Sequence, residues 1–439
     1  MKNKKVFIIL LVVLIIMSLG IYYVFKNNTN NGSDASVSSI TKNNLENIDW
    51  SSYENKEITL NKSVEITQEG VYQLTGTIND GYIYINTDGN VKLILNNVNV
   101  TNKNGPAIYV ENAKNVEIST LKNTTNTFED GTNYSGYDEN IDACIYSKDD
   151  LILSGEGTLK VIANYKDGIV SKDDLDITGG EYIITAKNDA IKGKDSIEIA
   201  NGIFTLEATG DGITATNDTD EGKGYIVIEN GTFNIKTTGT TADSSSKGIK
   251  AVTQIEINNG TFEINSTDDG IHTNGDIKIN GGTFKITSQD DGIHADGMIE
   301  INNGSYDINA AEGIEATYVK INDGSINISA TDDGINAGNK SDKYSVTIEI
   351  NGGNINIKMG NGDTDAIDSN GNLYINGGTI DITCNSPFDY DGEAKYIGGT
   401  LIVNGEKTNT ITNQMMGGGM MGGMPQDGDM PRGRNRNMR

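Results

Sequence analysis

A repeat of roughly 22 residues runs through most of this 439-residue chain and limits the folds open to it. Each unit opens on two apolar residues at spacing two, such as Ile277 and Ile279, and passes through a glycine turn into a second apolar pair, such as Phe284 and Ile286. A third short apolar stretch follows an Asp-Gly pair, as at 291–293. Spacing two is typical of half-buried strands, and no segment sustains the 3.6-residue period of a helix. The repeat therefore predicts an all-β fold, a right-handed parallel β-helix with three short strands in each rung.

Stacked rungs place equivalent residues about 4.8 Å apart. The aromatic positions of the second strand should then form one interior column, made of Phe204, Phe233, Phe262 and Phe284 and closed by Tyr306. We interpret these rings as core rather than as a ligand platform, because stacking buries them without any long-range loop. Less regular rungs indicate that the β-helix begins near residue 56.

The N-terminus carries the features of a membrane signal. Lys2, Lys4 and Lys5 precede an uncharged apolar run at 6–25 that is about long enough to cross a bilayer. No small-residue cleavage site follows this run, which favours an uncleaved signal anchor over a removed signal peptide. We expect a single-pass protein of the cell membrane with an extracellular β-helix, or a secreted protein if the segment is cleaved.

Composition divides the rest of the chain. Residues 26–55 are rich in Asn, Ser and Thr, which predicts a flexible linker. The last segment is rich in Met and Gly and ends on a basic cluster, which is typical of a disordered tail. The expected organisation is a signal anchor at 1–25, a linker at 26–55, a β-helix at 56–410 and a tail at 411–439.

The formal net charge of −27 argues against a nucleic-acid partner, because phosphate contacts need clustered basic residues. The only arginines are Arg432, Arg434, Arg436 and Arg439, so the body of the chain contains none. An acidic protein of this kind favours cations or neutral polymers as partners.

The acids are not spread evenly, because one position of the repeat concentrates them. The residue before the Gly or Ala of the third strand is acidic in eight of nine repeats: Asp167, Asp189, Asp211, Lys247, Asp269, Asp291, Glu312, Asp333 and Asp365. Second acids precede three of them, at Asp268, Asp290 and Asp332. Charges about 4.8 Å apart repel by about 1 kcal/mol in water and more at a shielded surface. A hard divalent cation would offset this repulsion, so we expect these acids to bind Ca²⁺. The alternative is that Asp-Gly serves only as a turn pair.

A second column, two residues beyond that Gly or Ala, is mostly polar and should face outward. Its candidate ligand-binding members are Lys192, Lys250, His272, His294, Glu315, Asn336 and Asp368. His272 and His294 are the only histidines and should stack one rung apart. They are either part of a transition-metal site or hydrogen-bond partners of the carboxylates.

The repeated element at 277–293 and the Met/Gly-rich segment at 415–424 resemble the extracellular carbohydrate-binding domains of cellulolytic clostridia. Those domains fold as pectate-lyase-like right-handed β-helices, and the resemblance covers most of 56–410. It implies binding of plant-cell-wall polysaccharide, including acidic pectic chains, with calcium held by the Asp columns.

These observations favour non-catalytic, calcium-dependent binding of a pectic or cellulosic polysaccharide. The first alternative is a calcium-dependent pectate lyase. Because the body lacks arginine, its base would be Lys192 or Lys250, with a pKa lowered by nearby cations. The second alternative is a structural or adhesive solenoid without a ligand.

Overall fold

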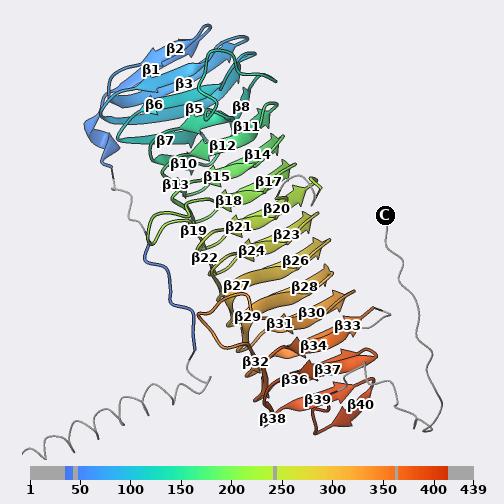
Figure 1. Cartoon of the computed structure of the whole chain (residues 1–439). Coiled ribbons are helices and arrows are strands. Elements are labelled where there is room, and N and C mark those ends of the chain that lie inside the picture. Colours follow the sequence, from blue (N-terminus) through green and yellow to red (C-terminus); the bar gives the residue numbers. More distant parts are fainter. Residues whose placement is uncertain (1–34, 43–47, 241–244, 361–363, 414–439) are drawn as a thin grey trace, which may run out of the picture.

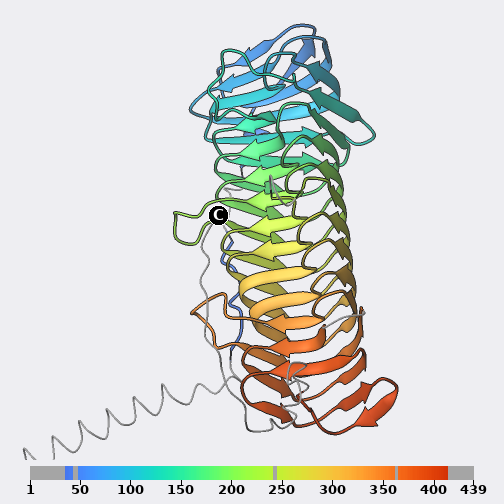
Figure 2. The same cartoon turned by 45° about the vertical axis from the view of Figure 1, so that its right-hand side comes forward.

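The computed structural model describes residues 35–42, 48–240, 245–360 and 364–413. These residues form 40 strands and one short 3-10 helix, η1 (Trp50–Ser52). Strands of successive rungs pair in parallel along one axis, and among the described residues the single antiparallel pair is β39 with β40 at the end. The chain is therefore a parallel β-helix, and Figures 1 and 2 show the rungs stacked into one long column.

Each rung contributes one strand to each of three sheets. The first sheet contains β1 (Asn55–Leu60), β3 (Gly70–Ile78), β5 (Asn90–Thr101), β7 (Asn115–Thr120), β10 (Leu151–Gly155), β13 (Asp174–Ile177), β16 (Ser196–Ile199), β19 (Tyr225–Ile228), β22 (Gln254–Ile257), β25 (Asp276–Ile279), β32 (Thr347–Ile350), β35 (Asn372–Ile375) and β38 (Ala394–Tyr396). The second sheet contains β8 (Thr125–Glu129), β11 (Thr158–Ala163), β14 (Glu181–Ala186), β17 (Ile203–Ala208), β20 (Thr232–Thr237), β23 (Thr261–Ser266), β26 (Thr283–Ser288), β28 (Ser305–Ala310), β30 (Ser325–Ala330), β33 (Asn354–Met359), β36 (Thr379–Thr383), β39 (Thr400–Val403) and β40 (Glu406–Thr408). The third sheet contains β2 (Val64–Ile66), β4 (Ile83–Asn86), β6 (Ile108–Asn112), β9 (Ala143–Ser147), β12 (Asp167–Ser171), β15 (Ile191–Gly193), β18 (Ile213–Ala215), β21 (Ile249–Ala251), β24 (Ile271–Thr273), β31 (Ile335–Ala337), β34 (Asp365–Ser369) and β37 (Ser386–Tyr390). Some longer strands belong to two sheets. The strands β27 (Ile293–Ile301) and β29 (Ile314–Ile321) belong to both the third and the first sheet. The strand β5 pairs with β7 in the first sheet and with β8 in the second.

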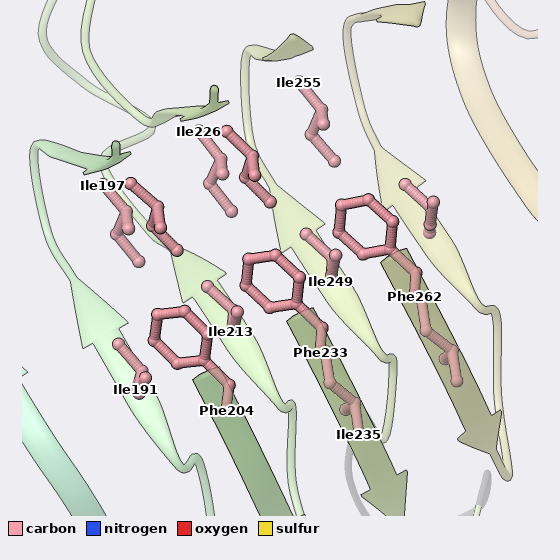
Figure 3. Packing of buried hydrophobic residues seen from close by; sticks show 14 of the residues in the cluster. Ile191, Ile197, Phe204, Ile213, Ile226, Phe233, Ile235, Ile249, Ile255 and Phe262 are labelled. Carbon is pink, nitrogen blue, oxygen red and sulfur yellow. The ribbon is translucent and has the colours of Figure 1, made fainter. Parts of the chain in front are cut away.

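The predicted aromatic column forms the centre of the core. Its rings stack nearly parallel, with centroids 4.6 to 5.0 Å apart, in the order Tyr182, Phe204, Phe233, Phe262, Phe284 and Tyr306. Figure 3 shows three of these rings between the isoleucines of the other two sheets. The prediction from the repeat is confirmed, and Tyr182 extends the stack by one rung. Burying one such ring stabilises the fold by roughly 1.5–3 kcal/mol.

The glycine that precedes each aromatic strand is required by the turn. Gly260 has a φ of +136°, and a Cβ there would lie 2.8 Å from the Phe262 ring. Glycine is the residue that adopts this backbone without strain. The Gly-Thr-Phe sequence of the repeat therefore encodes both the turn and the position of the ring that follows.

An N-terminal strap, defined as residues 35–42, lies along the outer face of the first sheet (Figure 1). The Val37 N–H donates to the Glu300 carboxylate at 2.9 Å, and the Ile40 N–H donates to Glu256 at 2.8 Å. Further contacts join Lys320 to Ala35, Gln254 to Ser38, Lys278 to Ser39 and Lys42 to Glu229. Composition predicts a flexible linker over 26–55, whereas this part of it is bound to the β-helix by side chains from several rungs.

The expected signal anchor lies outside the described residues, as does the tail from residue 414. Within the part of the chain that the structure describes, no helix is long and apolar enough to cross a membrane.

Candidate functional site

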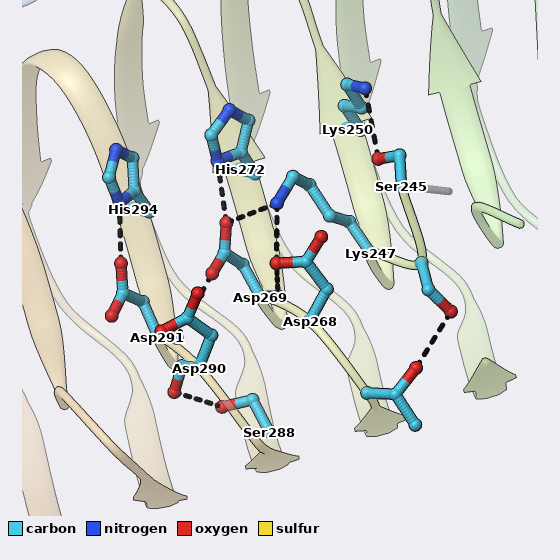
Figure 4. Close-up of polar contacts among 12 residues, drawn as sticks. Ser245, Lys247, Lys250, Asp268, Asp269, His272, Ser288, Asp290, Asp291 and His294 are labelled. Atoms are coloured by element: carbon cyan, nitrogen blue, oxygen red, sulfur yellow. Dashed lines mark hydrogen bonds and ion pairs between the residues drawn. The ribbon is translucent and has the colours of Figure 1, made fainter. Parts of the chain in front are cut away.

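The outward residues of the third sheet form one continuous, mostly polar column, as the repeat predicts. Strand register places Lys192 beside Thr214, Lys250 beside His272, and His294 beside Glu315. The full order is Val170, Lys192, Thr214, Lys250, His272, His294, Glu315, Asn336 and Asp368. Figure 4 shows its middle section. Directly beneath it lies the acid ladder, the name used here for the acidic residues that precede the Gly or Ala of the third strand, from Asp167 to Asp365.

The acid ladder is more deeply buried than a turn edge would be. Its members Asp167, Asp189, Asp211, Asp269 and Asp291 are between 0% and 7% exposed. Their carboxylates connect the rungs: the Asp189 N–H donates to Asp167 Oδ1 at 3.0 Å, and the Asp211 N–H donates to Asp189 Oδ1 at 2.9 Å. The same link joins Lys247 to Asp211, Asp291 to Asp269, and Asp365 to Asp333. Each linked carboxylate thus satisfies a buried amide of the next rung, which is a structural role beyond that of a turn.

Lysines provide positive charge along the N-terminal half of the ladder. Lys192 Nζ lies 3.4 Å from Asp167 and 3.0 Å from Asp189, so it bridges two rungs. Lys250 Nζ lies 3.7 Å from Asp211 and donates to the Ser245 hydroxyl oxygen at 3.0 Å. In these rungs the ammonium groups and backbone N–H groups offset part of the repulsion, although burial and Asp189 still raise the pKa of Asp167 to about 6.

The lyase hypothesis needs surroundings that lower the pKa of Lys192, but its actual surroundings raise it. Burial alone would lower its pKa, but Asp189 and Asp167 outweigh burial and raise the pKa of Lys192 above its ordinary value. A lysine with a raised pKa is protonated at neutral pH and is a poor general base. The expectation of a lowered pKa is therefore wrong for Lys192.

The doubled acids form a compact group that already contains a cation. Carboxylate oxygens of Asp268, Asp269 and Asp290 lie within 4.8 Å of one another. Lys247 Nζ contacts Asp268 Oδ1 at 2.8 Å and Asp269 Oδ2 at 2.7 Å. A calcium ion at this point would have to displace the ammonium group. The third doubled pair, Asp332–Asp333, lies nearer the C-terminus and is less buried.

The two histidines stack as predicted, with ring centroids 4.8 Å apart. His272 Nδ1 is 2.7 Å from Asp269 Oδ2, and His294 Nδ1 is 2.6 Å from Asp291 Oδ2. Burial lowers the pKa of His272. For His294, burial acts in the same direction but is outweighed by hydrogen bonds to Asp291 and Glu315, which raise its pKa to about 10. The neighbouring rings therefore differ in charge at neutral pH.

The C-terminal rungs hold carboxylates whose charge is not matched. Among the described residues, no ion pair involves Glu312, Asp333 or Asp368. Burial, followed by neighbouring carboxylates, raises the pKa of Asp333 to about 6 and of Asp368 to about 7. Burial is also the main cause that raises the pKa of Glu312 to about 8. These groups remain difficult to ionise unless a cation joins them.

Two buried oxygen atoms beside these carboxylates have no hydrogen-bond partner, namely Asn336 Oδ1 and Asp389 Oδ1. Register places Asn336 and Asp389 on either side of Asp368 in the same outward column. Such atoms are costly unless an unobserved group binds them. A donor set of carboxylate and amide oxygens suits calcium, so the residues of this stretch fit that ion. Asp365, which links to Asp333 through its N–H, lies beside them.

Sequence reasoning missed the N-terminal continuation of the column, where aromatic side chains replace the charged ones. Tyr84, Tyr109 and Tyr146 occupy the equivalent outward positions of β4, β6 and β9. Tyr134 and Tyr137 from the 131–142 loop pack against them. The early rungs are irregular, so the repeat alone did not give their register. The spacing-two pattern of Ile83, Ile85 and the intervening Tyr84 was the available signal.

The fold and site define a parallel β-helix with a polar column along one sheet and unmatched carboxylates at its C-terminal end. A sequence model described as carbohydrate-binding domain-containing protein matches residues 60–244, 236–292 and 285–396. The chain belongs to this carbohydrate-binding domain family.

A curated relative from Acetivibrio thermocellus, also described as a carbohydrate-binding domain-containing protein, is 36% identical over 150 residues. The match covers 33% of this chain and 50% of the relative, so it spans half of that protein. A solved structure described as the polysaccharide lyase-like protein from C. thermocellum, as a gadolinium derivative, shares 28% identity with a TM-score of 0.45. That match covers 56% of this chain and 95% of the solved chain.

Proposed function

We propose that this protein binds acidic polysaccharide at the cell surface in a calcium-dependent and non-catalytic manner. Membership of a carbohydrate-binding domain family supports a polysaccharide partner. The observation that carries the proposal is the C-terminal part of the outward column, where Asn336, Asp368 and Asp389 present buried or half-buried oxygen atoms without a basic partner among the described residues.

Calcium would serve two purposes on this face. It would neutralise Asp333 and Asp368, whose raised pKa values record the cost of ionising them together. It would also supply positive charge to a sugar carboxylate, which the net charge of −27 would otherwise repel. Glu312, Asn336 and Asp365 are the further oxygen donors on neighbouring rungs. Of the eleven predicted metal-ligating acids, the proposal retains Glu312, Asp333 and Asp365.

Polygalacturonate is the polymer that this arrangement suits best, because its carboxylates can share calcium with the protein. A neutral cellulosic chain would instead use aromatic platforms, and the tyrosines of the N-terminal rungs are largely packed against one another. The raised pKa of Lys192 argues against lyase chemistry at that residue. We therefore propose binding without cleavage.

The experiment compares the double variant Asp333→Asn/Asp368→Asn with Asp307→Asn, which removes an exposed carboxylate from β28 on the second sheet. Calcium binding is measured by calorimetry, and glycan binding by retention on polygalacturonate and on cellulose. We expect the double variant to lose calcium uptake and polygalacturonate retention, while the control keeps both. Unchanged binding by the double variant would contradict the proposal.

We also propose that residues 6–25 anchor the protein in the cell membrane, with the β-helix outside. The support is the apolar run behind three lysines. Fractionation of cells that express the full chain tests it: the protein should stay with membranes after high-salt washing and be accessible to added protease. Recovery in the culture medium would indicate cleavage and secretion.

A further inference from the structure

Three side chains converge at one point on the outer face of the third sheet. His294 Nδ1 lies 2.6 Å from Asp291 Oδ2 and 2.9 Å from Glu315 Oε2. The side chains of His294, Asp291 and Glu315 are only 12%, 8% and 9% exposed. One imidazole N–H cannot serve two carboxylates with good geometry at once, so the charge at this point is incompletely matched. Figure 4 shows His294 and Asp291 directed toward one another.

The surroundings fix Glu315 in this orientation. Lys340 Nζ contacts Glu315 Oε1 at 2.7 Å, and the Asn336 side-chain amide donates to the same oxygen at 3.2 Å. The other oxygen, Oε2, is left to face His294. Outer partners that saturate one carboxylate oxygen and orient the other are typical of metal ligands.

Asp291 differs from the ladder members that precede it. The carboxylates of Asp167, Asp189 and Asp269 each accept the N–H of the next acidic position. Within residues 245–360 no hydrogen bond joins the Glu312 N–H to the Asp291 carboxylate; the interruption occurs where the following rung is one residue shorter. Asp269 accepts the inter-rung N–H and pairs with His272 at the same time, whereas Asp291 pairs with His294 without the inter-rung link.

The neighbouring histidine does not have the same setting. His272 shares Asp269 Oδ2 with the Lys247 ammonium, which lies 2.7 Å from that oxygen. A dication would be repelled there unless Lys247 moved. At His294, Lys340 contacts the opposite oxygen of Glu315, so among the described residues no ammonium group lies between the converging atoms. A metal ion here would take the place of the proton on His294 Nδ1.

We propose that Asp291, His294 and Glu315 bind a first-row transition-metal dication, with Zn²⁺ as the probe. One imidazole and two carboxylates form a mixed nitrogen and oxygen set that such ions accept, and their ligand atoms lie within 4.8 Å of one another. Three protein ligands leave a further position for water or for an oxygen of a bound sugar. Binding of a sugar oxygen to the metal rests on the proposed function, whereas metal binding itself does not.

The test titrates Zn²⁺ into the full chain by calorimetry in saturating calcium, and follows the visible absorption of Co²⁺ in parallel. We expect one Zn²⁺ per chain. His294→Ala should weaken binding by more than the roughly 10–100-fold typical of losing an outer partner. His272→Ala is the matched control, because His272 lies one rung away and is 13% exposed against 12% for His294. It should keep the wild-type affinity.

Glu315→Gln provides a second variant if His294→Ala fails to fold, and it should also lose the Co²⁺ absorption band. Binding of Zn²⁺ that is equal in wild type, His294→Ala and Glu315→Gln would overturn the proposal, as would an absence of Zn²⁺ binding by the wild type. Since polygalacturonate and calcium uptake are scored separately, failure here is distinguishable from failure of the proposed function.

Discussion

Asp368→Asn should stabilise the calcium-free protein and weaken its calcium binding. Both effects come from the loss of the same carboxylate, which is costly to ionise without calcium and binds the ion when calcium is present. Burial and the carboxylates of Asp333, Asp389 and Asp365 raise the pKa of Asp368 from 3.8 to about 7. A rise of this size corresponds to roughly 4 kcal/mol at about 1.36 kcal/mol per pH unit. Because Asp368 is only half-buried, solvent screening reduces the expected gain to about 1–2 kcal/mol.

The pH dependence follows from the raised pKa. Ionising Asp368 lowers the stability of the folded protein. This loss is complete above about pH 7 and absent below the unfolded pKa near 4, where the carboxyl group is protonated in both states. In the absence of calcium, the variant should therefore melt roughly 2–5 °C higher than wild type at pH 8, with no difference near pH 4. Calcium should raise the melting temperature of wild type more than that of the variant.

Thermal melting by circular dichroism, with and without calcium, measures both effects, and Asp307→Asn controls for loss of one charge. A calcium-free variant that melts below wild type at pH 8, or one with an unchanged response to calcium, would refute this reasoning.

Three further predictions concern the core, the strap and the ladder. Phe262→Ala should lower the free energy of unfolding by about 3–5 kcal/mol in chemical denaturation, because it interrupts the ring stack; a loss below about 1 kcal/mol would contradict that role. Glu256→Gln/Glu300→Gln should speed proteolysis within 35–42 severalfold in a time course read by mass spectrometry, and an unchanged rate would argue against a bound strap. Lys192→Ala should lower the free energy of unfolding by about 1–3 kcal/mol at pH 8, because Asp167 is fully buried beside it, and unsaturated product should not appear in either protein; equal stability would refute the bridging role.

The rungs, the aromatic column and the two polar columns could be predicted from the sequence because each depends on local spacing alone. A repeat of apolar pairs fixes which residues face inward, and stacking then sets the neighbours of Phe262 and His272. The raised charge density along the third sheet follows from the same alignment.

What offsets that charge could not be read from the repeat. Lys247 reaches forward one rung to Asp268 and Asp269, and the Asp189 N–H binds back to Asp167, so both depend on side-chain direction between rungs. The strap was missed because its contacts join residues at least 187 positions apart, such as Lys42 and Glu229 or Val37 and Glu300. Polar composition predicts a solvated segment, but it does not show that carboxylates elsewhere accept its backbone N–H groups.

The most direct test of calcium-dependent, non-catalytic binding is calorimetric titration of the full wild-type chain with polygalacturonate, first in calcium and then in excess chelator. Absorbance for unsaturated product is followed in the same samples. Saturable heat in calcium, its loss in chelator and no product are the results predicted here. Equal binding in chelator, an absence of binding in calcium, or the appearance of unsaturated product would contradict the account.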